Sequence, residues 1–127
     1  MSNYALPGEL PPALYNSLII SDNRTKHILP IDHILRLESK RVYTIVYAKD
    51  HQQYICSRNI KVVYAELQSR LFFRIHKSHV INLREVKAYK QGRGGKVIMS
   101  DNTEIDVAQR KKTEFLKSFY ELVALTI

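Results

Sequence analysis

The chain has 127 residues, 45% of them hydrophobic and 25% charged, and it carries a net charge of +8 with a pI near 9.7. This length suits one domain with its own core, and the excess of basic side chains favours polyanionic partners. A single cysteine excludes an intrachain disulfide, and no apolar run approaches the roughly 18 residues of a membrane-spanning helix. We therefore expect a cytoplasmic protein with no membrane partner.

The N-terminal segment differs in composition from the rest of the chain. Residues 1–17 hold three of the four prolines and show no hydrophobic period. This pattern is typical of a linker or an N-terminal arm. Such a start suits a domain tethered to something upstream, although an arm packed on the domain fits equally well. The folded domain is expected to span residues 18–127.

From Leu18 onward, runs of β-branched and aromatic residues alternate with turn residues, which indicates short strands. We expect strands over 18–21, 26–31, 42–48 and 53–57, with a turn at Asp32 and His33 that runs into one more strand. Asp32 is a plausible N-cap for that turn. Residues 58–67 place Ile60, Val63, Tyr64 and Leu67 at the spacing of one helical face, and Ser57 is the candidate cap.

The stretch Leu71–Val86 (LFFRIHKSHVINLREV) reads as a strand, a polar loop and a second strand. The predicted loop is His76–His79, held out into water by an apolar strand on each side. It presents several hydrogen-bond donors and a positive charge with almost nothing to bury. A solvated turn without a function fits the same pattern. Loops fixed by a scaffold often carry function, which makes this one a candidate site.

The C-terminal third begins with two predicted strands, 86–91 and 96–100, that flank the glycine-rich loop Gly92–Gly95. No helix follows this loop, so a flexible turn is favoured over a phosphate cradle. A strand is expected over 104–108. It precedes a helix over 110–125 with Phe115, Phe119, Leu122 and Val123 on one side. Basic residues in the first turn of that helix oppose its dipole, which suggests an anion site.

Basic residues gather in three segments that are well separated in the sequence. Residues 70–96 carry a net charge of +7, and residues 36–49 and 110–117 carry +3 each. Each segment alone fits a solvated face. They form one binding surface only if the fold brings them together.

Two blocks of the sequence resemble the LytTR (LytR/AlgR-type) DNA-binding domain of bacterial transcription regulators. The first is FFRIHKSHVINLREVKAY, and the second, after a glycine-containing hairpin, is KVIMSDNTEIDVAQRKKTEFLKSF. The matching positions of the first block are Arg74, His76, Lys77, Ser78, Ile81, Asn82 and Val86. The segment IDHILRLES and the strand containing Tyr43 fit the upstream part, so the resemblance covers about residues 18–120.

The resemblance implies a mainly β fold of short antiparallel strands in small stacked sheets, with one or two short helices including a C-terminal one. It implies sequence-specific binding of double-stranded DNA by loops in the major groove. The chain would be the output domain of a two-component response regulator with an upstream receiver or sensor domain, dimerising on direct repeats in promoters. The residues expected to bind DNA are Lys40, Arg41, Tyr43, Arg74, His76, Lys77, Ser78, Gln109, Arg110, Lys111 and Lys112.

Within these residues, Lys77 is expected to read a guanine edge and Arg110 a base about one helical turn away, from a loop at the other end of the domain. His76 either touches DNA or bonds a backbone carbonyl to hold its loop. One departure concerns the segment after the last strand. The family usually has Ser-Arg there, whereas this chain has Ala108 and Gln109 followed by Arg110. The base preference at that half of the site is therefore open.

Other functions fit the residues less well. His76 and His79 form the only close histidine pair, and their spacing on a strand-loop-strand does not predict a metal site. No nucleophile, base and acid form a catalytic motif, so we expect neither an enzyme nor a cofactor. RNA binding is the alternative, because Tyr43, Tyr47, Tyr54 and Tyr89 lie near basic residues and are able to stack on bases. These tyrosines alternate with polar residues in the predicted strands, so packing in a core also explains them.

Overall fold

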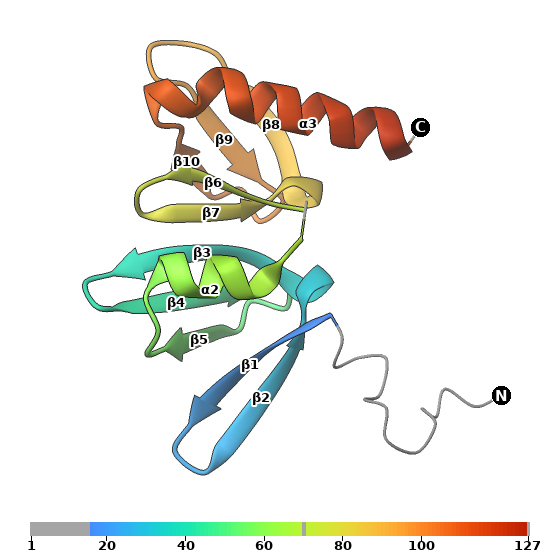
Figure 1. Ribbon diagram of the computed structural model, residues 1–127. Helices are drawn as coiled ribbons and strands as arrows, with labels where there is room; N and C mark the ends of the chain where they lie inside the picture. The colour runs from blue at the N-terminus through green and yellow to red at the C-terminus, as the bar shows by residue number, and fades with distance from the viewer. Residues whose placement is uncertain (1–15, 70, 127) are drawn as a thin grey trace, which may run out of the picture.

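A computed structural model describes residues 16–69 and 71–126 and shows a mainly β architecture (Figure 1). The strands are β1 (Ser17–Asp22), β2 (Thr25–Pro30), β3 (Ile34–Lys40), β4 (Tyr43–Ala48), β5 (Gln53–Cys56), β6 (Phe72–His76), β7 (His79–Asn82), β8 (Val86–Lys90), β9 (Lys96–Met99) and β10 (Glu104–Asp106). The helices are α2 (Ile60–Leu67) and α3 (Lys112–Thr126), with 3-10 turns η1 (Ile31–His33), η2 (Leu83–Glu85) and η3 (Gln109–Lys111).

The strands form three antiparallel sheets, which confirms the expected fold of short antiparallel strands in small sheets. β1 and β2 form a two-stranded sheet. A five-stranded sheet has the order β5-β4-β3-β7-β6, and a three-stranded sheet has the order β10-β9-β8. β6 is therefore an outer strand of the larger sheet. Short connections explain the antiparallel pairing, because two-residue turns join β3 to β4 and β6 to β7.

Two hydrophobic cores lie on opposite sides of the five-stranded sheet. The first contains the buried face of α2, formed by Ile60, Val63 and Leu67, as the helical spacing predicted. The second gathers residues of the three-stranded sheet around Phe115 of α3. The neighbouring residues Phe72 and Phe73 divide between the two cores, because successive side chains of a strand point to opposite faces.

Buried Asn82 fixes the end of β7. Its Nδ2 donates to the carbonyl of Ile34 on β3 at 2.9 Å, and its Oδ1 accepts from the backbone N–H of Arg84 at 3.0 Å. The side chain thus satisfies its own polar atoms while it joins the sheet to η2.

The structure corrects several details of the predicted helices. The N-cap of α2 is Asn59, whose Oδ1 accepts from Val62 N–H at 3.0 Å, rather than Ser57. Asp32 lies inside η1 and does not cap it. The α-helical part of α3 begins at Lys112, after the 3-10 turn η3, and Val123 is 37% exposed rather than packed in the core. Leu116 packs against the core near Phe115.

The predicted N-terminal arm lies outside the described residues, apart from Asn16 and Ser17. Ser17 begins β1, and the carbonyl of Asn16 accepts from Ile31 N–H at 2.8 Å. Within residues 16–69 and 71–126, no helix is long and apolar enough to cross a membrane.

Candidate nucleic-acid interface

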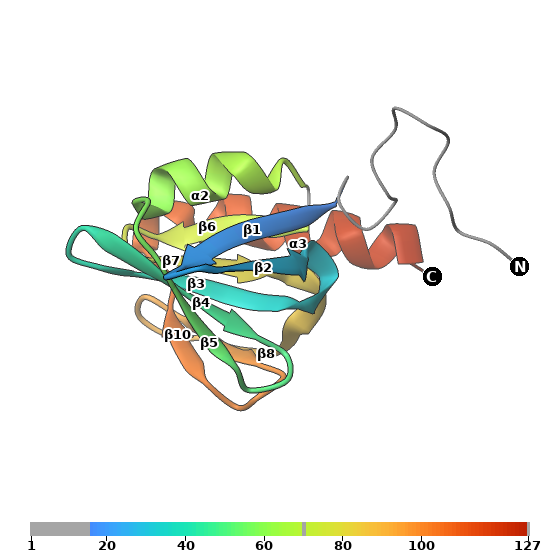
Figure 2. The same cartoon turned by 90° about the horizontal axis from the view of Figure 1, so that it is seen from below.

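Four connections between strands and helices lie at one end of the molecule, on the left in Figures 1 and 2. They are the β3–β4 turn, the β6–β7 turn, the β8–β9 loop and the segment from β10 to α3. Three backbone hydrogen bonds join them: Ser39 N–H to Ser78 C=O at 2.9 Å, Ala108 N–H to Ile75 C=O at 3.0 Å, and Val107 N–H to Gly95 C=O at 3.2 Å. The fold thus brings parts of all three basic segments to one surface.

The β6–β7 turn is shorter than the sequence suggested. His76 and His79 form the last pair of the two strands, so only Lys77 and Ser78 make the turn. Both histidines are half-buried, and their ring centroids are 5.4 Å apart. The expectation of a four-residue loop with almost nothing to bury was wrong, because the strand pairing resumes after a register shift between Arg74 and His76 and includes both histidines.

Side chains of the neighbouring strand hold this turn in place. Arg74 Nη2 donates to the carbonyl of Lys77 at 2.6 Å, and Ser78 N–H donates to His76 Nδ1 at 3.1 Å. His76 therefore has a structural role, but as an acceptor rather than as a donor to a carbonyl. Because Nδ1 accepts, the neutral ring carries its proton on Nε2. The Lys77 side chain is exposed and makes no bond with any other described residue.

A hollow of about 250 Å³ separates the β6–β7 turn from the start of α3. Its lining residues are Arg74, His76, Lys77, Ala108, Arg110 and Lys111. Four of these carry a positive charge and none carries a negative one. A hollow of this composition suits an anion such as a DNA phosphate or a base edge rich in acceptors.

Lys77 and Arg110 both line this hollow. This corrects the expectation that their loops lie at the two ends of the domain, one helical turn of DNA apart. The hydrogen bond from Ala108 N–H to Ile75 C=O holds the start of η3 beside β6 and explains the difference. Both residues therefore line the same hollow.

The polar and basic residues of η3 and of the first position of α3 have different surroundings. Gln109 and Arg110 are exposed, and within the described chain neither side chain has a partner. Lys111 Nζ lies 3.6 Å from Glu114 Oε2 and 5.9 Å from the centroid of the Phe73 ring. Lys112 Nζ donates to the carbonyl of Gly92 at 3.0 Å. Lys112 thus ties the β8–β9 loop to the helix.

The β3–β4 turn supplies the remaining predicted residues. Arg41 has a φ of 58°, is exposed and is not bonded to any residue that the structure describes. Tyr43 is 36% exposed. Lys40 Nζ lies 3.6 Å from Glu38 Oε2, so this cation is partly compensated.

A polar cluster on the five-stranded sheet lies beside this turn. The Arg36 Cζ atom is 3.7 Å from the centroid of the Tyr47 ring, and Arg36 Nη1 lies 3.3 Å from Glu38 Oε1. Tyr47 Oη donates to the same carboxylate oxygen at 2.9 Å. Arg36 is buried and therefore adds no charge to the surface, although the sequence placed it in a basic segment.

Burial and these contacts change three pKa values. Burial raises the pKa of the Glu38 carboxyl, but the hydrogen bonds from Tyr47 and Arg36 together with the Arg36 charge outweigh it, so the pKa is lowered. Burial, followed by the bond to Glu38, raises the pKa of Tyr47. Burial lowers the pKa of His79, which pairs with Glu38 across β3 and β7. The buried Nδ1 of His79 has no hydrogen-bond partner among the described residues.

Several basic residues of the segment 70–96 add no unpaired charge to this end of the molecule, because they are paired with other side chains or lie elsewhere. Lys90 and Lys96 pair with Glu104 and Asp106 of β10 at 3.4 and 3.3 Å. Lys87 Nζ donates to Asn102 Oδ1 at 2.6 Å. Arg84 lies in η2, away from the four connections (Figure 1), and Arg70 lies outside the described residues.

Sequence reasoning did not single out Arg93, an exposed cation in the β8–β9 loop at the same end of the molecule. This loop appeared to be only a flexible turn, yet Lys112 and Val107 bond to it on either side of Arg93. Arg93 is exposed, with no partner in the described part of the chain. A basic residue between glycines of a hairpin loop was the only available signal.

No group of three His, Cys, Asp or Glu residues within 16–69 and 71–126 is placed to hold a metal ion.

Comparisons with known proteins agree with this geometry. Residues 24–119 match the family model of the LytTr DNA-binding domain. The structure is also similar to a solved LytTr DNA-binding domain from Bacillus cereus, whose parent protein is described as a methyl-accepting/DNA response regulator. That match has a TM-score of 0.71 and 19% sequence identity, and it covers 81% of this chain and 95% of the other. No curated protein matches the chain. The family match spans most of the sequence, and the chain therefore belongs to the LytTR family of DNA-binding domains, the output domains of transcription regulators.

Proposed function

We propose that this domain binds double-stranded DNA with sequence specificity, through the β3–β4 turn, the β6–β7 turn and the segment from β10 to α3 in the major groove. The observation that carries the proposal is the hollow between Lys77 and Arg110, which is ringed by cations and lined by no acid. The N-terminus of α3 lies at the same end (Figure 1), so its dipole also favours a phosphate there.

The proposed division of labour follows the contacts of each residue. Lys77 and Arg110 read bases, because both are exposed and free of internal partners. Arg41 and Arg93 contact phosphates at the edges of the surface. The other residues proposed to contact DNA are Lys40, Tyr43, Ser78, Gln109, Lys111 and Lys112. Arg74 and His76 position the β6–β7 turn through their bonds to it.

The biological setting is part of the same proposal. We propose that the chain is the output domain of a cytoplasmic two-component response regulator, with a receiver or sensor domain upstream and two copies on direct repeats of a promoter. The response-regulator description of the Bacillus cereus protein supports this setting. We propose no catalytic activity and no cofactor.

Fluorescence anisotropy with a labelled duplex of mixed sequence tests the proposal. We expect the duplex to stay bound against an excess of single-stranded RNA. The double substitution Lys77→Ala and Arg110→Ala should weaken binding roughly tenfold or more, because each residue makes a charge-assisted contact.

The matched control is the double substitution Lys61→Ala and Arg84→Ala. It removes the same charge from exposed residues of α2 and η2. An equal loss of affinity in this control would contradict the proposed surface, and better competition by single-stranded RNA than by duplex DNA would contradict the proposed ligand.

A further inference from the structure

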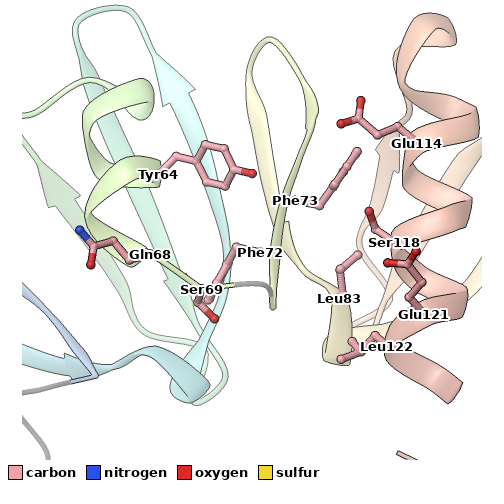
Figure 3. Close-up of a pocket in the computed structure, with 10 residues that line it drawn as sticks. All are labelled: Tyr64, Gln68, Ser69, Phe72, Phe73, Leu83, Glu114, Ser118, Glu121 and Leu122. Carbon is pink, nitrogen blue, oxygen red and sulfur yellow. The ribbon is translucent and has the colours of Figure 1, made fainter. Parts of the chain in front are cut away.

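A second surface lies where the two hydrophobic cores meet on the outside of the molecule. Its floor is β6, the outer strand of the five-stranded sheet, with Phe72 packed into one core and Phe73 into the other. α2 and α3 flank this strand without covering it, and the groove between them has a volume of about 690 Å³ (Figure 3). The segment at Ala108 bonds to the Ile75 end of this strand, whereas the groove lies at its Phe72–Phe73 end. Outer strands are preferred places for another chain to bind.

The walls of the groove combine apolar and acidic groups. Tyr64 of α2 points into it from one side, and Glu114 and Glu121 of α3 point into it from the other (Figure 3). Tyr64 and Leu122 are only partly buried, which leaves apolar surface on both walls. A partner with apolar side chains would cover this surface.

The charge of the groove is opposite to that of the whole chain. Among the residues that the structure describes, its lining includes two glutamates and no lysine, arginine or histidine, although the net charge of the protein is +8. Glu121 has no ion-pair or hydrogen-bond partner among the described residues, and Glu114 contacts only Lys111, at 3.6 Å. Two carboxylates in a groove favour a partner with basic side chains.

We propose that this groove docks a segment of a partner protein in which apolar side chains are flanked by Lys or Arg. The lining residues of α3 run from Glu114 to Leu122, roughly 12 Å along the helix at 1.5 Å per residue. That length matches about four residues of an extended segment. Apolar side chains contact Tyr64 and Leu122, and the flanking cations pair with Glu114 and Glu121.

The groove is separate from the proposed DNA-binding surface. Its lining residues come from β6, from the two helices and from the segments next to them (Figure 3). The connections proposed to bind DNA lie at one end of the molecule (Figures 1 and 2). A DNA-bound domain is therefore free to hold the partner segment as well. Two of its lining residues, Glu114 and Phe73, interact with Lys111 of the DNA-binding hollow. Glu121 is thus the residue that tests the groove alone.

A library of random 12-residue peptides displayed on phage serves as the probe. We expect selection on the full chain to enrich peptides with apolar residues flanked by Lys or Arg. One enriched peptide, made synthetically, should bind Glu121→Lys at least tenfold more weakly than the unmodified protein. Asp22→Lys is the matched control, because it makes the same change of charge. Asp22 is exposed, has no partner among the described residues and lies in the hairpin β1–β2. It should bind the peptide normally.

Duplex DNA binding is measured on the same samples. We expect Glu121→Lys and Asp22→Lys to affect it equally, so failure of this proposal is distinguishable from failure of the DNA-binding one. Three results would overturn the docking proposal: no enriched peptide, enriched peptides without basic residues, or equal peptide affinity for both variants. A concentration-dependent dimer that Glu121→Lys abolishes would instead assign the groove to a second copy of the chain.

Discussion

At the scale of single residues, several cations of the proposed DNA-binding surface fall into two groups. Arg41, Lys77 and Arg110 have no internal partner among the described residues, so they are free to contact DNA without breaking an existing bond. Arg74 and Lys112 donate to backbone carbonyls of neighbouring connections. Arg74 thus holds the turn that carries Lys77, and Lys112 holds the loop that carries Arg93. Such preorganisation reduces the entropy that binding costs.

His79 gives a prediction about pH. Burial lowers its pKa, so the unfolded chain takes up a proton more readily than the folded one. The stabilising effect is fully present above the ordinary histidine pKa of about 6.5 and is lost as the pH falls through the lowered value. Glu38 follows the same sign at lower pH, because its pKa is lowered too.

We therefore expect the free energy of unfolding to fall between about pH 7.5 and pH 5.5, and to fall less in His79→Gln. Urea denaturation at the two pH values measures it. His51→Gln, at an exposed position, is the control and should keep the full pH dependence. The same pH dependence in His79→Gln as in the unmodified protein would contradict this role of His79.

At the scale of elements, the β8–β9 loop contains one glycine that leaves no room for a side chain. Gly95 has a φ of +68°, and a Cβ added there would lie 2.5 Å from Tyr89 Oη and 3.0 Å from two ring carbons. Gly94 has a φ of +86° and open space around it. Substitution of either glycine by alanine strains the backbone, but only Gly95→Ala also displaces Tyr89.

We expect Gly95→Ala to lower the free energy of unfolding by about 1–3 kcal/mol more than Gly94→Ala. Urea denaturation of the two variants measures the difference. Equal destabilisation by the two substitutions would show that the close approach of Gly95 to Tyr89 does not affect the free energy of unfolding.

The sequence predicted the elements more reliably than their ends. The strands, α2 and α3 follow from hydrophobic periodicity, which is a local property. The cap at Asn59 and the late start of α3 at Lys112 depend on competition between neighbouring polar groups. The short β6–β7 turn follows a register shift between Arg74 and His76, which leaves no clear mark in the residues around Lys77.

At the scale of the whole molecule, the candidate site could be predicted only in part. The residues of the β6–β7 turn came from a motif, but the position of Arg110 at the same hollow as Lys77 depends on a hydrogen bond between Ala108 and Ile75, far apart in the sequence. The same limit explains why Arg93 was not singled out. The charge counted along the sequence also overstated the positive charge of the surface, because Glu104 and Asp106 of β10 pair with Lys90 and Lys96.

The salt dependence of binding follows from this charge distribution. Each phosphate contact releases condensed counterions, with a slope of roughly 0.9 in log affinity against log salt concentration. Arg41→Ala should lower the slope by about that amount, since Arg41 is exposed and unpaired in the described structure. Arg84→Ala should leave the slope unchanged. Affinity that does not depend on salt would be incompatible with phosphate contacts.

The proposed arrangement on direct repeats predicts stronger binding to two sites than to one. Binding of one copy raises the effective concentration of a second copy that it contacts or is tethered to. Titration of duplexes with one site, or with two sites spaced by one helical turn, compares the two cases. We expect a higher affinity per site on the two-site duplex. Equal affinity per site would argue against cooperation between copies.

The most direct test is selection of binding sites from random duplex DNA with the unmodified domain, Lys77→Ala, Arg110→Ala and the control Arg84→Ala. The account predicts that Lys77→Ala and Arg110→Ala each lose preference at one position, by roughly 1–3 kcal/mol, and that the two positions are neighbours in one groove. Arg84→Ala should select the unmodified site. Recovery of the unmodified site by all three variants, with only lower affinity, would contradict the claim that these loops read the sequence.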